Sequence, residues 1–213
     1  MNISSRLQNL AAILVAGLIL TGCDAISKPY PDRSMYAVAV GVPDDTKPGE
    51  GRGILKVTRI RVDAPYDDRT FFYKVGANEF KADYYNAFVS SPDRMFTLLL
   101  QDYLLNSGGF DTFLPPSSGA DSDFRLEGNI RALYADFSEG PTPSAVIEAR
   151  FFLIAMDTAD DVVMAEKSYR QRVKAGSGDP EAIAQAWGEA LTAIFSNLAD
   201  DLIGAVEPGS HTR

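Results

Sequence analysis

The stretch FRLEGNIRALYADF, residues 124–137, decides the fold class because apolar or small residues alternate with polar ones along it. The residues expected on one face are Phe124, Leu126, Gly128, Ile130, Ala132 and Tyr134. The residues expected on the other face are Arg125, Glu127, Asn129 and Arg131. Successive side chains of a strand point to opposite faces, so this pattern predicts a long strand with one buried face.

Two more long strand candidates follow, at 145–156 and 162–173. The acidic segment DTADD (157–161) lies between them and predicts a turn, so we expect an antiparallel hairpin. On the N-terminal side the candidates are shorter, and they cover residues 35–42, 54–62, 71–75, 80–82 and 110–114. The apolar pattern inside 54–62 shifts by one position, which indicates a bulge.

Two helices are marked by their first residues. Ser91 precedes Pro92, and Asp179 precedes Pro180, so each helix has a capping residue followed by proline at its first position. Glycines at 108–109 and at 204 predict the ends of the two helices. The helical residues expected to be buried against the sheet are Phe96, Leu99, Leu104, Trp187, Leu191, Ile194 and Leu198.

The order strands, helix, strands, helix favours an α+β fold. We expect one antiparallel or mixed β-sheet with two main helices packed on one face. The other face of the sheet carries many polar residues, and we expect it to be solvated or to bind a partner.

The first residues have the pattern of an export signal. Arg6 is followed by an apolar run at 10–20, which is too short to span a membrane, and then by LTGC at 20–23. The ending resembles the lipobox of bacterial lipoproteins, in which the thiol of the cysteine accepts the lipid. We therefore expect residues 1–22 to be a signal peptide and Cys23 to be the lipidation site.

The remaining boundaries follow from composition. Residues 23–34 hold the lipidated cysteine and a proline-containing, flexible tether, residues 35–204 form the globular domain, and residues 205–213 form a mobile tail. Because the chain has a single Cys, no intramolecular disulfide can form, and the domain depends on its core. The chain has 20 Lys and Arg against 29 Asp and Glu, which disfavours binding to nucleic acid or to an anionic membrane by bulk charge.

Few residues carry obvious chemistry. The single histidine, His211, lies in the expected tail, and Cys23 is used for lipid, so no triad or His/Cys zinc site is expected. The adjacent carboxylates face different ways and are expected to be solvated charges; they are Asp44–Asp45, Asp67–Asp68, Asp160–Asp161 and Asp200–Asp201. We expect no catalytic residue, no metal and no cofactor.

The aromatic segment around Tyr84, Tyr85 and Phe88 is the candidate contact site. Two adjacent tyrosines cannot both point inward on regular structure. We expect part of the segment to be exposed at a rim and to contact a partner protein or a second copy of the chain. Tyr84 is favoured, because Tyr85 and Phe88 would share a face of a helical turn and could be buried together. A purely structural role in the core is the alternative.

The segments FFYK (71–74), DYYNAF (83–88) and SGGF (107–110), with the lipobox cysteine and the strand at 126–137, resemble the ABC-type transport auxiliary lipoprotein family. That family includes the paraquat-inducible C lipoprotein. The resemblance covers roughly residues 35–203. It implies a membrane-anchored accessory, not an enzyme, that serves a lipid or hydrophobic-solute transport system of the bacterial envelope. The implied partners are a mammalian-cell-entry-type substrate-binding protein, an ABC permease and an ATPase.

Two alternatives stay open. One is a structural or assembly lipoprotein of the outer membrane without a transporter partner. The other is a carboxylate-dependent periplasmic enzyme, which a carboxylate pair with shifted pKa values in a deep pocket would indicate. The anchored domain would face the periplasm. Asp24 resembles an inner-membrane retention signal, whereas members of the family commonly act at the outer membrane. The inner and the outer membrane therefore both stay open as the site of the anchor.

Overall fold

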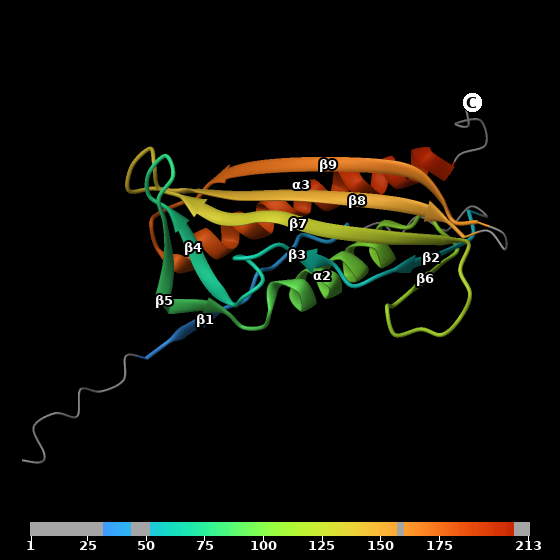
Figure 1. The fold of residues 1–213 in the computed structure, drawn as a ribbon, viewed down its shortest axis with the longest axis horizontal. Coiled ribbons are helices and arrows are strands. Elements are labelled where there is room, and N and C mark those ends of the chain that lie inside the picture. Colours follow the sequence, from blue (N-terminus) through green and yellow to red (C-terminus); the bar gives the residue numbers. More distant parts are fainter. Residues whose placement is uncertain (1–31, 44–51, 157–159, 207–213) are drawn as a thin grey trace, which may run out of the picture. The chain divides into compact units, whose positions relative to one another are not determined.

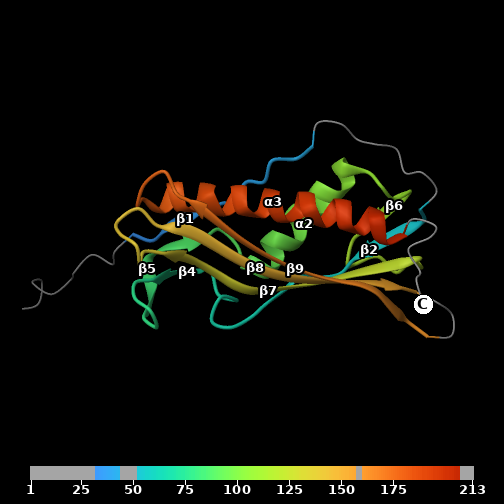
Figure 2. The same ribbon diagram turned by 90° about the horizontal axis from the view of Figure 1, so that it is seen from above.

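The computed structural model describes residues 32–43, 52–156 and 160–206. All of these except Asp32 belong to a compact unit that begins at Arg33. Within that unit, two helices lie on the same side of a nine-stranded mixed sheet (Figures 1 and 2). The fold class expected from the sequence is thereby confirmed. The helices are α2 (Pro92–Ser107) and α3 (Pro180–Val206). The strands are β1 (Ser34–Tyr36), β2 (Ile54–Val57), β3 (Arg61–Val62), β4 (Thr70–Lys74), β5 (Phe80–Phe88), β6 (Thr112–Leu114), β7 (Phe124–Asp136), β8 (Ser144–Ala155) and β9 (Val162–Lys174).

Strand β7 is the central strand of the sheet. Along one edge it pairs antiparallel with β8 over its whole length, from Phe124 opposite Ala155 to Asp136 opposite Ser144. Strand β9 then pairs antiparallel with β8. The three long strands expected from alternation are therefore present, within one or two residues of the predicted bounds.

The other edge of β7 is built from three short strands in succession. Strand β2 pairs with residues 124–126, β3 with 129–130 and β4 with 135–136, and all three run parallel to β7. Strand β6 extends the sheet beyond β2, while β5 and then β1 extend it beyond β4. One continuous edge is thus assembled from segments scattered along the N-terminal half of the chain.

The single strand expected at 54–62 is in fact two strands, β2 and β3. Between them the backbone N–H of Ile60 donates to the hydroxyl of Thr97 in α2, at 2.9 Å, instead of continuing the ladder. The hydroxyl of Thr58 donates to the carbonyl of Leu126 at 2.9 Å and fills the gap at the β7 side. At this interruption the hydroxyl groups of Thr97 and Thr58 provide hydrogen bonds for backbone groups of Ile60 and Leu126. The break between β2 and β3 explains the shifted apolar pattern.

The strand expected at 35–42 is much shorter, because β1 ends at Tyr36. The following segment packs on α3 instead: the N–H of Gly41 donates to the hydroxyl of Thr192 at 3.0 Å. A Cβ placed on Gly188 of α3 would come within 2.1 Å of the carbonyl oxygen of Ala39, so this close approach requires glycine. By contrast, β5 is longer than expected and reaches Phe88.

The expected tether and tail also change at their inner limits. Ser34, expected in the tether, belongs to β1, and Ala205 and Val206, expected in the tail, are the last residues of α3. Residues 1–31 and 207–213, including Cys23 and His211, lie outside the described residues.

A bulge in β7 corrects the alternation predicted for this strand. The pairing with β8 shifts between Ile130 and Ala132, so Arg131 is an extra residue. Before the bulge, Leu126 and Ile130 belong to the core beneath the helices, but after it Leu133 and Ala135 take that position. Ala132 and Tyr134, expected on the same face, instead form a small cluster on the opposite one with Tyr66, Phe72 and Val146.

Trp187 packs α3 against β4, β5 and β7. Its ring lies 4.8 Å from Phe71 of β4 and 5.2 Å from Phe88 of β5, measured between centroids. Its indole N–H donates to the backbone carbonyl of Tyr134 in β7 at 3.3 Å. The helical residues expected in the core are buried, except that Leu99 is only partly so.

Candidate functional site

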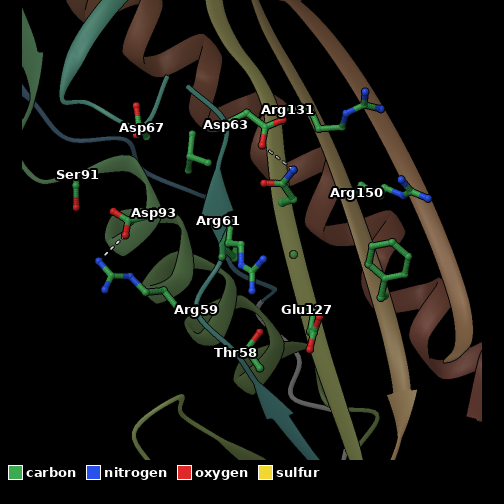
Figure 3. A pocket seen from close by; sticks show the side chains of 15 residues that line it. Thr58, Arg59, Arg61, Asp63, Asp67, Ser91, Asp93, Glu127, Arg131 and Arg150 are labelled. Atoms are coloured by element: carbon green, nitrogen blue, oxygen red, sulfur yellow. Dashed lines mark hydrogen bonds and ion pairs between the residues drawn. The ribbon is translucent and has the colours of Figure 1, made fainter. Parts of the chain in front are cut away.

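A broad groove of about 1190 Å³ opens beside the central strand (Figure 3). Strands β3, β7 and β8 and the start of α2 contribute its walls. Asn129 of β7 and Arg150 of β8 lie directly opposite each other within it. The sequence pattern had placed Asn129 on the polar face, which is the face that this groove occupies.

Charges of both signs line the groove in equal number. The residues are Arg59, Arg61, Arg131 and Arg150 together with Asp63, Asp67, Asp93 and Glu127. Arg59 forms an ion pair with Asp93, and the side-chain amide of Asn129 donates a hydrogen bond to the carboxylate of Asp63 at 3.0 Å. Both interactions are drawn as dashed lines in Figure 3. The lining is therefore formally neutral, and it suits a polar or zwitterionic group better than a simple anion.

Two polar atoms in the groove are buried without a hydrogen-bond partner among the described residues. They are the amide oxygen of Asn129 and the Nε of Arg150. The guanidinium of Arg150 also stacks over the ring of Phe152, at 4.8 Å from its centroid, and pairs with Glu166. A buried donor beside a buried acceptor can take up one water molecule or one polar ligand group.

An ion-pair ladder continues from the groove across β7, β8 and β9. Arg170 pairs with Glu148 at 3.2 Å, and Arg172 pairs with Asp136 at 2.7 Å. Partial burial alone would raise the pKa of Asp136, but hydrogen bonds from Arg172 and Ser138 lower this pKa to about 2. The ladder compensates the charges of the polar face and keeps Asp136 ionised.

The described carboxyl groups whose pKa clearly shifts accept hydrogen bonds that favour the ionised form. The pKa values with a clear shift belong to Asp83, Asp93, Asp136 and Asp201, and all four are lowered. A raised carboxyl pKa, which the enzyme alternative needs, is not found among these described groups.

Of the adjacent aspartates, Asp161 forms an ion pair with Arg125, and Asp201 accepts hydrogen bonds from Lys167 and Tyr169. These two carboxylates are therefore paired rather than simply solvated. Asp44–Asp45 lies outside the described residues.

The second feature is an aromatic bulge, residues 83–86, in β5. Phe72 of β4 pairs with Ala82 and Thr70 pairs with Ala87, so these four residues of β5 stand opposite Phe71 alone. They cannot all take part in the antiparallel ladder. The bulge therefore turns consecutive side chains away from the regular alternation of a strand.

Asp83 holds the aromatic bulge in shape. Its carboxylate accepts from the hydroxyl of Tyr73 at 2.7 Å, from the side-chain amide of Asn86 at 2.7 Å, and from the backbone N–H groups of Tyr85 and Asn86 at 2.8 and 3.1 Å. Burial would raise the pKa of Asp83, but these hydrogen bonds outweigh it and lower the pKa. Burial and the bond to Asp83 raise the pKa of Tyr73.

The bulge presents both tyrosines outward. Tyr84 is 64% exposed and Tyr85 is 56% exposed, and their rings meet edge to face at 6.0 Å. Phe88 is only 1% exposed and packs at 4.6 Å from Phe71, so its assignment as a contact residue is wrong. The expected helical pairing of Tyr85 with Phe88 is also wrong, because the segment is a bulged strand. The bulge is defined by the pairing register of β4 and β5, which the sequence alone does not give.

The described residues contain no helix that is long and apolar enough to cross a membrane. They also contain no group of three or more His, Cys, Asp or Glu side chains arranged to hold a metal ion.

The class that the fold defines is a single-sheet α+β domain with both helices on one face and a polar, grooved second face. The family model of the ABC-type transport auxiliary lipoprotein component matches residues 36–199. The chain therefore belongs to this family, as the sequence motifs indicated.

Solved structures share the fold at low sequence identity. Protein XCC0632 from Xanthomonas campestris superposes with a TM-score of 0.70 at 20% identity, over 81% of this chain and 96% of its own. An uncharacterised protein gives a TM-score of 0.63 at 12% identity, over 80% and 99% of the two chains. The hypothetical protein CT253 from Chlamydia trachomatis gives 0.50 at 10% identity, over 72% and 97%. The comparison with curated proteins finds no match.

Proposed function

We propose that this chain is a lipid-anchored, non-catalytic accessory of an ABC-type transport system that moves lipid or another hydrophobic solute in the bacterial envelope. The observation that carries the proposal is the family match over residues 36–199. In this role the chain associates with a mammalian-cell-entry-type substrate-binding protein and with the ABC permease and ATPase.

The anchor is proposed from the sequence LTGC at residues 20–23. Cleavage before Cys23 and acylation would place the domain on the periplasmic side of a membrane. A single acyl chain gives only marginal binding, whereas two or more chains hold a protein stably. The anchor therefore explains how an acidic domain stays at a membrane surface that its charge does not favour.

Mass spectrometry of the mature N-terminus tests the anchor. We expect the wild-type chain to begin at an acylated Cys23, and Cys23→Ser to remain unprocessed or soluble. Thr21→Ser is the matched control, because it keeps a small residue before the cleavage site and should be processed normally. An unmodified Cys23 in the wild type, or cleavage at another position, would refute this part of the proposal.

Co-purification tests the transport role. The wild-type chain is isolated from detergent-solubilised membranes of its own host, and the mammalian-cell-entry protein, permease and ATPase are quantified by mass spectrometry. We expect these three proteins to be enriched with wild type and depleted with Cys23→Ser. If an acylated chain brings down none of them, the structural or assembly lipoprotein is the better description.

A further inference from the structure

The aromatic bulge lies beside the strand at which the described domain begins. Strand β1 pairs in parallel with β5, with Ser34 opposite Asn86 and Met35 opposite Ala87 (Figure 1). Just beyond β5, the N–H of Val89 donates to the carbonyl of Tyr36 at 3.0 Å. Met35 and Val89 are exposed, as are both tyrosines of the bulge. We call these four residues (Met35, Tyr84, Tyr85 and Val89) the anchor-proximal surface.

The chain between the proposed lipid and this surface is short. Only residues 24–33 separate Cys23 from Ser34. A chain of this length reaches at most about 40 Å when fully extended, at 3.3–3.6 Å per residue. The lipid therefore keeps β1, and the surface beside it, within that distance of the bilayer.

We propose that the anchor-proximal surface is a membrane-interface contact, which seats this end of the domain on the bilayer that holds Cys23. The inference rests on the proposed lipid anchor. Tyrosine has an apolar ring and a polar hydroxyl, and such side chains concentrate at the boundary between lipid and water. Met35 on the paired strand and Val89 just beyond β5 add exposed apolar side chains near the bulge in the sheet.

The construction of the bulge supports this assignment. The four hydrogen bonds to Asp83 fix the backbone that carries Tyr84 and Tyr85, so little conformational freedom is lost when the rings enter the interface. The contact also needs no attraction between opposite charges. It can therefore form on zwitterionic lipid although the chain carries a formal charge of −9.

The small size of the surface favours a bilayer over a protein partner. A stable protein interface buries about 800 Å² on each side and uses about 20–30 residues. A four-residue surface falls far short of that size. The lipid, however, makes the membrane contact intramolecular, so a weak interaction is enough to hold the domain in place.

Tryptophan quenching by brominated lipid tests the proposal with the full, acylated chain. The natural Trp187 is completely buried and gives a constant background. Tyr84→Trp and Tyr85→Trp place reporters on the bulge, and Val163→Trp is the matched control. Val163 is 57% exposed at the start of β9, at the end of the sheet opposite β1 and β5 (Figure 1).

The proteins are reconstituted into phosphatidylcholine vesicles with bromine near the headgroup end of the acyl chains. We expect at least twofold quenching of the added fluorescence for Tyr84→Trp and Tyr85→Trp, and almost none for Val163→Trp. Flotation of the vesicles separately reports the anchor. If the chain does not float, the anchor fails and this inference falls with it.

If the chain floats but the bulge reporters are quenched no more than the control, the anchor stands and the membrane contact is refuted. An emission shift that appears only on addition of the mammalian-cell-entry partner, or only as protein concentration rises, would assign the surface to that partner or to a second copy. Either outcome would also overturn the proposal.

Discussion

The two flanks of β7 are built in opposite ways. On one flank, β8 and β9 form a long antiparallel hairpin whose pairing runs with a single irregularity at each interface. On the other, β2, β3 and β4 each cover only two or three residues of β7. The long flank carries the charge-compensated ladder, whereas the short flank contributes to the groove and leads to the aromatic bulge.

The difference shows which part of the sheet can present side chains outside the regular strand pattern. A long hairpin satisfies its backbone through its own ladder, so substitutions are constrained by register. The short strands end in gaps that side chains must fill, as Thr97 does for Ile60 and Asp83 does for the bulge. These gaps allow polar and aromatic side chains to be presented outside the regular pleat.

Removing the side chain that packs α3 onto the short flank should have the largest effect. Trp187→Ala would leave a cavity between Phe71, Phe88 and β7, and we expect the free energy of unfolding to fall by about 3–5 kcal/mol. Urea unfolding followed by circular dichroism measures the change. Leu98→Ala, at an exposed position of the other helix, should change it by less than about 0.5 kcal/mol. Equal effects would mean that Trp187 does not hold α3 to the short flank.

A methyl group at the contact between α3 and the segment after β1 should have an intermediate effect. Gly188→Ala would push against the carbonyl of Ala39, and we expect a loss of about 1–3 kcal/mol in the free energy of unfolding. Gly204→Ala is the control on the same helix, where an added Cβ meets no atom within 4 Å. That control should be neutral or stabilising, because alanine is the better helix former. A harmless Gly188→Ala would show that the N-terminal segment is loosely attached.

Acid should weaken the long flank through Asp136. The pKa of this carboxyl is about 2 in the folded chain and 3.8 as its ordinary value, so its stabilising contribution is present above pH 4 and disappears as pH falls towards 2. We expect wild type to lose about 1–2 kcal/mol more than Asp136→Asn between pH 6 and pH 2. Urea unfolding at both pH values measures the difference. Parallel losses in the two proteins would contradict the proposed role of the Arg172 pair.

The same contrast explains what could be predicted from the sequence. Alternation found β7, β8 and β9, and capping residues with proline found both helices, because these signals are local. The bulge at Arg131 was missed, so Ala132 and Tyr134 were placed on the wrong face. The shifted apolar pattern at 54–62 indicated an irregularity there, but the split into β2 and β3 involves Thr97, which is distant in sequence.

The candidate site was predicted in part for the same reason. The argument that two adjacent tyrosines cannot both point inward correctly indicated that Tyr84 is exposed, but it did not predict the exposure of Tyr85. The burial of Phe88 depends on Phe71 and Trp187, and the groove depends on the opposition of Asn129 and Arg150. Both arrangements follow from strand pairings between distant segments.

The three short strands on one edge of β7 also impose an order on biosynthesis. Strands β2, β3 and β4 leave the ribosome before β7, the strand on which they pair, has been made. At about 5–20 residues per second, they wait several seconds for that template. Such pairings between distant segments slow folding in general. A chain with an export signal would gain from this delay, because these strands cannot complete the sheet, and so close the fold, before β7 has been made.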